Sequence, residues 1–194
     1  MPLPQLDKDS GFEMHDLLDS REFTQRTPKT HVTNREQLAL KKIAEQFSAP
    51  PEAMLQELLQ AAVDYCGADS AGVSLEEQDE TGNLRFRWIA VAGSFKKYLH
   101  GTTPRKFSPC GVCIDQWRPQ YYKVTKPYYD FLGVTAEPIL DGMLIPWESN
   151  ALRGTIWVVS HKTESAFDMS DYTMLKRLAD LISVAVRHQP RENP

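Results

Sequence analysis

Apolar residues at helical spacing mark three segments of the chain. The first helix is expected to begin at the capping-box sequence Thr33-Asn34-Arg35-Glu36, which can satisfy two free backbone N–H groups. A second helix is expected from near Ser48 to Cys66, with Gly67 as a left-handed cap, and a closing helix from about Asp168 to about His188. The apolar faces of the three helices comprise Leu40, Ile43, Ala44 and Phe47, then Leu55, Leu58, Leu59 and Ala62, then Leu175, Leu178, Ile182, Ala185 and Val186.

Between the second and the closing helix the apolar period changes to two, the period of a β-strand. Turn residues separate these stretches into hairpins, and strands joined by hairpins pair antiparallel. The predicted fold class is therefore α+β, a central antiparallel sheet of about five or six strands with terminal helices on one face. Apolar residues on both sides of the strands predict that loops and a short helix cover the other face. The strands are expected over 71–75, 84–92, 120–124, 139–147 and 152–161.

Residues 1–32 show little of this periodicity. They hold Pro2, Pro4 and Pro28 among scattered charges, which predicts a flexible N-terminal tail. The ordered domain is expected over 33–188, followed by a short C-terminal tail over 189–194.

Composition narrows the function classes. The 194 residues carry a net charge of −4, which argues against a domain that binds nucleic acid by neutralising phosphates. No apolar run approaches the roughly 20 residues of a membrane span, and the N-terminus lacks the basic and apolar regions of a secretory signal. The three cysteines, Cys66, Cys110 and Cys113, are too few for a secreted disulfide framework. We therefore expect a cytoplasmic protein without nucleic-acid or membrane partners.

Four stretches, in this order, resemble a GAF domain. They are CGADSAGVSL at 66–75, FSPCGVCIDQWRPQYYKV at 107–124, GMLIPWESNALRGTIWVVSHK at 142–162 and FDMSDYTMLKRLADLISVAV at 167–186. The wording GTTPRKFSPCG at 101–111 is closest to GAF domains attached to bacterial sensor histidine kinases. The resemblance implies a sensory module that binds a small molecule and signals through its terminal helices to a partner, such as a histidine kinase in two-component signal transduction.

The resemblance leaves the ligand and the cofactor unknown. Cyclic-nucleotide GAF domains typically carry an Asn-Lys pair followed by Phe-x-x-x-Asp-Glu. This chain has Phe167 and Asp171, but Tyr172 stands in place of the glutamate. Bilin-binding GAF domains usually anchor the chromophore on a Cys-His pair, and His follows neither Cys110 nor Cys113. Neither of these two ligand classes is expected.

Aromatic residues are dense in 117–131, in the region where the resemblance places the ligand pocket. This density in a polar loop predicts a wall or lid over an apolar pocket, with a hydrophobic cluster beneath a long loop as the alternative. The aromatic residues are Trp117, Tyr121, Tyr122, Tyr128, Tyr129 and Phe131. The predicted ligand-binding residues are Phe107, Cys110, Trp117, Tyr122, Tyr129 and Trp157.

Cys110 and Cys113 form a C-x-x-C motif, expected at the start of a short helix. A helix N-terminus stabilises a thiolate, so a redox dithiol is one interpretation. The GAF family also contains a free methionine sulfoxide reductase that works through cysteines near this region, but its further cysteines are missing from the loop 126–141 here. Two buried packing residues are the other interpretation. Zinc needs about four ligands, so no metal site is expected.

We therefore expect a sensory or regulatory module without catalytic activity. Two alternatives stay open: a thiol-redox enzyme with Cys110 and Cys113 as catalytic residues, and a ligand-free dimerisation module. A homodimer through the terminal helices is also expected. The closing helix carries Met174, Leu181 and Val184 outside its main apolar face, and the first helix carries Leu38 outside its own.

Overall fold

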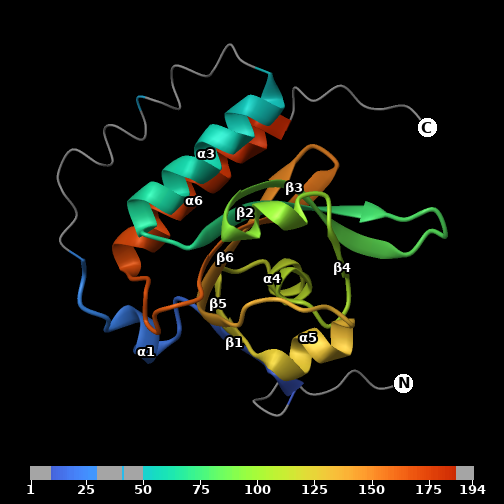
Figure 1. The fold of residues 1–194 in the computed structure, drawn as a ribbon. Helices are drawn as coiled ribbons and strands as arrows, with labels where there is room; N and C mark the ends of the chain where they lie inside the picture. Colours follow the sequence, from blue (N-terminus) through green and yellow to red (C-terminus); the bar gives the residue numbers. More distant parts are fainter. Residues whose placement is uncertain (1–9, 30–40, 42–49, 187–194) are drawn as a thin grey trace.

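The computed structural model describes residues 10–29, 41 and 50–186. Its centre is one antiparallel sheet of seven strands in the order β1-β5-β6-β7-β2-β3-β4. Figure 1 shows two long helices on one side of the sheet and the shorter helices α4 and α5 on the other. The predicted α+β class is confirmed, and the sheet has more strands than the five or six expected.

Two long hairpins form the middle of the sheet. The first joins β2 (Ser70–Gln78) to β3 (Leu84–Gly93), and the second joins β6 (Ile139–Ser149) to β7 (Leu152–Ser160). The first turn is stabilised by the Asp79 carboxylate, which accepts hydrogen bonds from the backbone N–H of Thr81 and of Asn83 at 2.8 and 2.9 Å. Strand β7 lies between β6 and β2, so the two hairpins form one surface.

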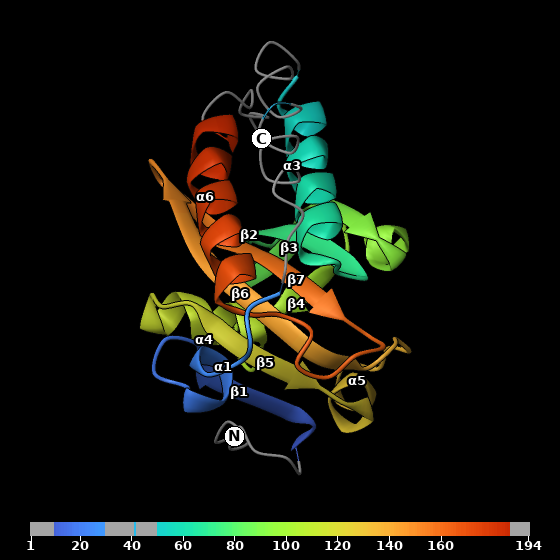
Figure 2. The same cartoon turned by 90° about the vertical axis from the view of Figure 1, so that its left-hand side faces the viewer.

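Helices α3 (Pro51–Cys66) and α6 (Met169–Ala185) lie side by side over one face of the sheet, called the helix face below (Figure 2). Helix α3 ends at Gly67 with φ 65°, the left-handed cap that was predicted. The Asp168 side chain caps α6, accepting from the backbone N–H of Ser170 and Asp171. The core beneath these helices includes Leu55, Leu58, Leu59, Ala62, Leu175, Leu178, Ile182, Ala71, Val73, Ile145, Ile156 and Val158.

Short elements cover the opposite face, called the pocket face below. They are η2 (Ser94–Tyr98), α4 (Pro109–Gln116) and α5 (Lys126–Leu132), and beside them the edge strand β4 (Thr102–Pro104) pairs with β3. The Ser108 hydroxyl caps α4 by accepting from the backbone N–H of Gly111 at 3.1 Å. Between α4 and α5 runs β5 (Gln120–Val124), which pairs with β6. The loop expected over 126–141 thus contains a helix.

The prediction of a flexible tail over 1–32 is wrong for residues 10–29, called the N-terminal arm below. The arm contains β1 (Phe12–Asp16) and α1 (Arg21–Thr24). Strand β1 pairs antiparallel with β5 and closes an edge that would otherwise present free N–H and C=O groups. The side chains of Phe12, Leu17 and Phe23 are 0% exposed. Strands β1 and β4 bring the sheet to seven.

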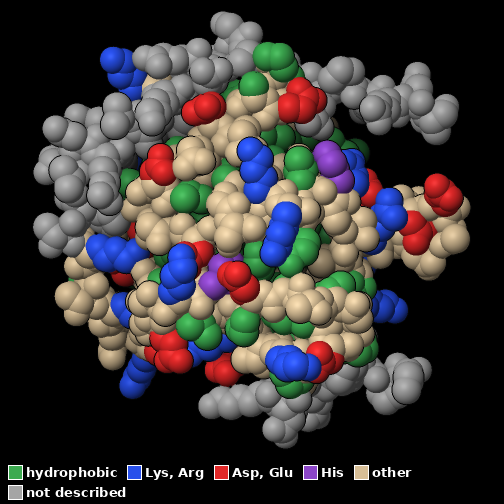
Figure 3. Space-filling model, viewed as in Figure 1, with side chains coloured by type: hydrophobic (Ala, Val, Ile, Leu, Met, Phe, Trp, Pro, Cys, Tyr) green, Lys and Arg blue, Asp and Glu red, His purple; other side chains and the backbone are tan. Residues whose placement is uncertain are grey.

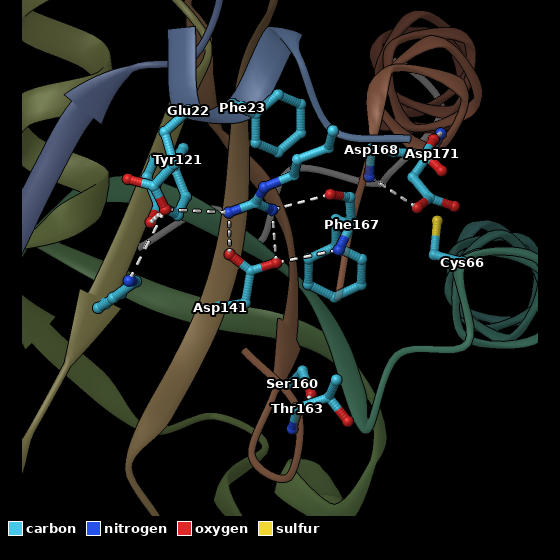
Figure 4. Close-up of polar contacts among 12 residues, drawn as sticks. Glu22, Phe23, Cys66, Tyr121, Asp141, Ser160, Thr163, Phe167, Asp168 and Asp171 are labelled. Carbon is cyan, nitrogen blue, oxygen red and sulfur yellow. Dashed lines mark hydrogen bonds and ion pairs between the residues drawn. The ribbon is translucent and has the colours of Figure 1, made fainter. Parts of the chain in front are cut away.

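A buried ion pair fixes the arm to the rest of the domain. Arg26 donates from Nη1 to Asp141 Oδ2 at 2.8 Å and from Nη2 to Oδ1 at 3.1 Å. Its Nη1 also donates to the carbonyl oxygen of Phe167 at 2.8 Å. Figure 4 shows Asp141, Phe167 and Tyr121 gathered below the segment that carries Glu22, whose carboxylate accepts from the Tyr121 hydroxyl at 2.7 Å. These contacts attach the arm to β5, to β6 and to the start of α6.

Some predictions fall outside the described residues. These are the capping box at Thr33, the helix over 33–47 with Leu38, and the tail over 189–194. On α6, Met174 is buried against its own chain, while Leu181 is half-buried and Val184 is exposed. Met174 therefore does not support the homodimer, which stays a prediction.

None of the helices in the described ranges is long and apolar enough to span a membrane. Among the described side chains on the face seen in Figure 3, basic and acidic groups are interspersed. A basic face of the kind typical of nucleic-acid-binding domains is not visible there.

Candidate functional site

A cavity of about 420 Å³ lies between the sheet and the elements that cover its pocket face. Strands β3, β5, β6 and β7 supply one part of its wall, and η2, β4, α4, α5 and the segment that follows α5 supply other parts. Among the described residues, no Asp, Glu, Lys, Arg or His side chain lines it. Its aromatic lining consists of Trp88, Phe95, Tyr98, Tyr122, Tyr128, Tyr129 and Trp157. The cavity is therefore apolar, aromatic and free of formal charge.

The aromatic side chains on the β3 side of the cavity support one another. The Trp88 and Trp157 rings have centroids 4.9 Å apart, and Trp88 stacks on Phe95 at 6.0 Å. Tyr98 meets Phe95 edge-on at 5.3 Å. Aromatic pairs at these separations are mutually attractive, so this part of the wall is held in a fixed shape.

Two glycines make room for the rings that lie on the sheet. A Cβ atom added to Gly72 would stand 2.1 Å from the Trp157 ring, and one added to Gly142 would stand 2.5 Å from the Tyr122 ring. Only a residue without a side chain allows these rings to lie flat against the strands. The shape of the cavity floor thus depends on glycine at two strand positions.

A short chain of buried hydrogen bonds holds Trp157 in place. The Trp157 indole donates to Ser74 Oγ at 3.0 Å, and the Cys110 thiol donates to the same oxygen at 3.6 Å. The Thr155 hydroxyl donates to Cys110 Sγ at 3.2 Å. Cys110 therefore takes part in positioning the cavity wall.

Both thiols of the C-x-x-C motif are buried and protonated. Burial raises the pKa of Cys110, although its hydrogen bonds to Thr155 and Ser74 act in the opposite direction. Burial raises the pKa of Cys113 well above its ordinary value, and this thiol donates to the carbonyl oxygen of Arg118 at 3.4 Å. Reactive thiols have lowered pKa values, so burial opposes the effect that the position of Cys110 in the first turn of α4 would have on its thiol.

Three polar atoms of cavity-lining residues are buried without a hydrogen-bond partner among the described residues. They are the indole nitrogen of Trp88, the hydroxyl of Thr103 and the hydroxyl of Tyr129. Burial also raises the pKa of Tyr129, so its hydroxyl is neutral. Unsatisfied buried polar groups are rare and cost roughly 1–3 kcal/mol each. The wall of the cavity therefore contains three polar groups that find no hydrogen-bond partner among the described residues.

Four of the six predicted ligand-binding residues, Cys110, Tyr122, Tyr129 and Trp157, line this cavity. Phe107 lies behind the wall, where its carbonyl oxygen accepts from the Tyr128 hydroxyl at 3.1 Å. Trp117 does not reach the cavity.

Trp117 ends α4 in a left-handed conformation, with φ 52°. Its side chain is 42% exposed beside a separate groove of about 310 Å³ along α6. Trp117 follows Gln116, the last residue of α4, and its side chain lies outside the cavity that α4 helps to cover.

Trp88, Phe95 and Tyr98 line the cavity but were not among the predicted binding residues. Trp88 lies in the strand predicted over 84–92, and the other two lie between that strand and the next predicted one. A signal was available, because these three aromatic residues occur within eleven positions of one another. No group of three or more potential metal ligands occurs in the part of the chain that the structure describes.

A sequence profile described as the GAF domain matches residues 48–187. The chain belongs to the GAF domain family. The fold agrees, since the GAF domain of a phosphoenolpyruvate-protein phosphotransferase from Coxiella burnetii superimposes with a TM-score of 0.59 at 18% identity, covering 79% of this chain and 94% of that one.

Two further solved GAF-type structures show how widely the fold is used. The phycoerythrobilin-bound GAF domain of a cyanobacterial phytochrome matches with a TM-score of 0.55 at 11% identity, over 80% of this chain and 96% of that one. A type II free methionine-R-sulfoxide reductase from Thermoplasma acidophilum matches with a TM-score of 0.54 at 19% identity, over 71% of this chain and 92% of that one. Comparison with curated protein sequences gives no match. At these identities the likeness concerns the fold alone.

Proposed function

We propose that this GAF domain is a cytoplasmic sensory or regulatory module that binds a small molecule in the aromatic cavity and has no catalytic activity. The observation that carries the proposal is an uncharged cavity of about 420 Å³ with three unsatisfied polar groups in its lining residues. Ligand pockets typically measure about 300–1,000 Å³ and combine an apolar wall with a few polar groups. A similar fold holds phycoerythrobilin in a cyanobacterial phytochrome.

Strand β7 offers a route from the cavity to the terminal helices. Trp157 and Val159 line the cavity, while Ile156 and Val158 belong to the core beneath α3 and α6. Alternate residues of one strand point to opposite faces, so a ligand that displaces Trp157 shifts the packing of both sides. The proposed receiver of this signal is a partner protein, such as a histidine kinase of a two-component system.

The direct test is native mass spectrometry of the protein purified from its own host. We expect a bound small molecule on the wild type. Leu132→Trp, which fills the cavity from α5, should lose this molecule, while Phe131→Trp, at a neighbouring position that is 60% exposed, should retain it. Circular dichroism of both variants checks that they are folded. Absence of any bound molecule from the wild type, together with no thermal stabilisation by a ligand collection, would overturn the proposal.

A thiol-redox enzyme remains the second candidate because Cys110 lines the cavity. The raised pKa values of both thiols support the non-catalytic proposal instead. Reduction of free methionine sulfoxide in the presence of a dithiol, abolished by Cys110→Ser, would establish the enzyme.

The proposed homodimer is tested separately by light scattering at micromolar concentration. Val184 is 39% exposed on α6, and Val184→Glu should dissociate a dimer that forms through this helix. Leu84→Glu, at a position in β3 that is 43% exposed and lies outside α6, is the matched control. A monomeric wild type would exclude the dimer and leave the ligand proposal unaffected.

A further inference from the structure

We infer that the ligand of the aromatic cavity is a neutral, flat molecule of about two or three rings. This inference rests on the proposed function and names the class of ligand for that site. It follows from the size of the cavity, its lack of charge and its aromatic walls.

The volume sets the size of the ligand. An apolar cavity of about 150 Å³ binds benzene, a single ring. The cavity here measures about 420 Å³, nearly three times as much. A molecule of about two or three fused or linked rings therefore fills it.

The wall excludes charged ligands. A carboxylate, phosphate or ammonium group moved from water into an apolar site without a partner is strongly disfavoured. The cation beside the wall is already committed, since Arg105 pairs with Glu76 and with Asp115. Lys97 lies 5.0 Å from the centre of the Tyr98 ring, but its side chain is exposed to solvent. A buried charge on the ligand would therefore have no counterpart.

The aromatic walls favour a flat ligand. Trp88, Trp157 and Phe95 come from the sheet and from η2, and Tyr122 and Tyr129 come from β5 and α5. Rings prefer offset-stacked or edge-to-face contacts with other rings. The wall offers such contacts from more than one direction, which an aliphatic ligand of the same volume would not use.

Three probes of the same two-ring size test this inference by isothermal titration of the whole chain. They are 2-acetylnaphthalene, which is neutral with an acceptor, 2-ethylnaphthalene, which is neutral without one, and 2-naphthoate, which is an anion. The ketone should bind wild type at least as tightly as the hydrocarbon, and the anion at least about 100-fold more weakly than the ketone. Leu132→Trp, which fills the cavity from α5, should weaken binding of both neutral probes at least about tenfold. Trp117→Phe, outside the cavity, is the matched control and should change neither.

The outcomes separate this inference from the proposed function. Naphthoate binding as tight as ketone binding overturns the neutral class, and undiminished binding of the neutral probes to Leu132→Trp overturns their assignment to this cavity. If no probe binds although a host molecule co-purifies with the protein, the inferred class is wrong and the proposed function stands. If no probe binds and nothing co-purifies, both fail.

Discussion

The two faces of the sheet are both apolar, yet they are built from different side chains. The helix face is mainly aliphatic and is packed by α3 and α6. Its buried carboxylates are paired, Asp141 with Arg26 at 2.8 Å and Asp171 with Lys29 at 2.7 Å. The pocket face is mainly aromatic and surrounds a cavity. Buried polar atoms without a partner among the described residues occur on both faces, since the indole nitrogen of Trp147 is one on the helix face and that of Trp88 is one on the pocket face. The faces therefore differ in their packing: two helices fill one, and the other leaves space for a ligand.

The largest expected effect is on the helix-face side, at the buried ion pair of the N-terminal arm. Arg26→Ala should lower the free energy of unfolding by about 3–5 kcal/mol, because it leaves the Asp141 carboxylate buried without its cation. Chemical denaturation measures this loss. Lys176→Ala removes a cation from an exposed pair with Asp180 and should cost less than about 1 kcal/mol. Equal losses in the two variants would show that the arm does not contribute to folding as described.

The next effect concerns the floor of the cavity. Gly72→Ala should destabilise the protein by about 1–3 kcal/mol, because the new methyl group forces the Trp157 ring away from β2. In a chain that already carries Trp157→Leu, the same Gly72→Ala change should cost much less, because the ring that the methyl group would meet is gone. The two single variants and the double variant form a thermodynamic cycle, measured by chemical denaturation. Additive losses would mean that the contact between Gly72 and Trp157 does not control the position of the ring.

Cysteine alkylation compares the two faces at neutral pH. Burial raises the pKa of Cys66 on the helix face and of Cys110 at the cavity, so both should react at least about tenfold more slowly than in urea-unfolded protein. Cys110 should react faster than Cys66 because it borders a cavity. The alkylation rate of Cys110 should rise with pH, because the thiolate fraction grows as the pH approaches the raised pKa of this thiol. Mass spectrometry of iodoacetamide-treated protein measures the rates, and fast labelling of Cys110 would instead favour the redox candidate.

The smallest effects come from a matched pair of tyrosines. Tyr121→Phe should cost about 1 kcal/mol, because its hydroxyl donates to Glu22 at 2.7 Å. Tyr129→Phe should be neutral or slightly stabilising, because the hydroxyl that it removes is buried without a partner. Thermal and chemical denaturation of the two variants gives the difference. A larger loss for Tyr129→Phe would mean that a bound water or ligand already satisfies this hydroxyl.

The regular parts of the fold could be predicted from the sequence because they are determined locally. Helix α3 combines a continuous apolar face with Gly67 at its end, and the two hairpins combine alternating residues with turn residues. The N-terminal arm has no such periodicity. Phe12 is buried against residues far along the chain, among them Phe107 and Tyr128, whose ring centroids lie 5.8 and 5.2 Å from that of Phe12. Such a contact depends on the assembled fold and leaves no local pattern.

The cavity could be predicted only in part, for a related reason. Tyr122 and Tyr129 lie in a dense aromatic stretch, so their role as wall residues was foreseen. Trp88 lies in a strand among ordinary strand residues, and its position at the cavity follows from the pairing of β3 with β2 and β4. Trp117 lies in the same dense stretch but faces away, because the end of α4 turns it outward. Composition therefore located the region but not the orientation of each side chain.

The N-terminal arm also bears on where this domain can be cut. The GAF match begins at residue 48, whereas β1 and Arg26 lie before it and complete the sheet edge and the buried ion pair. A fragment excised at the family boundary would present the open edge of β5 to other molecules, and such edges promote aggregation. For this protein the cooperative folding unit is therefore larger than the family module, and the arm must accompany the domain when it is transplanted into another protein.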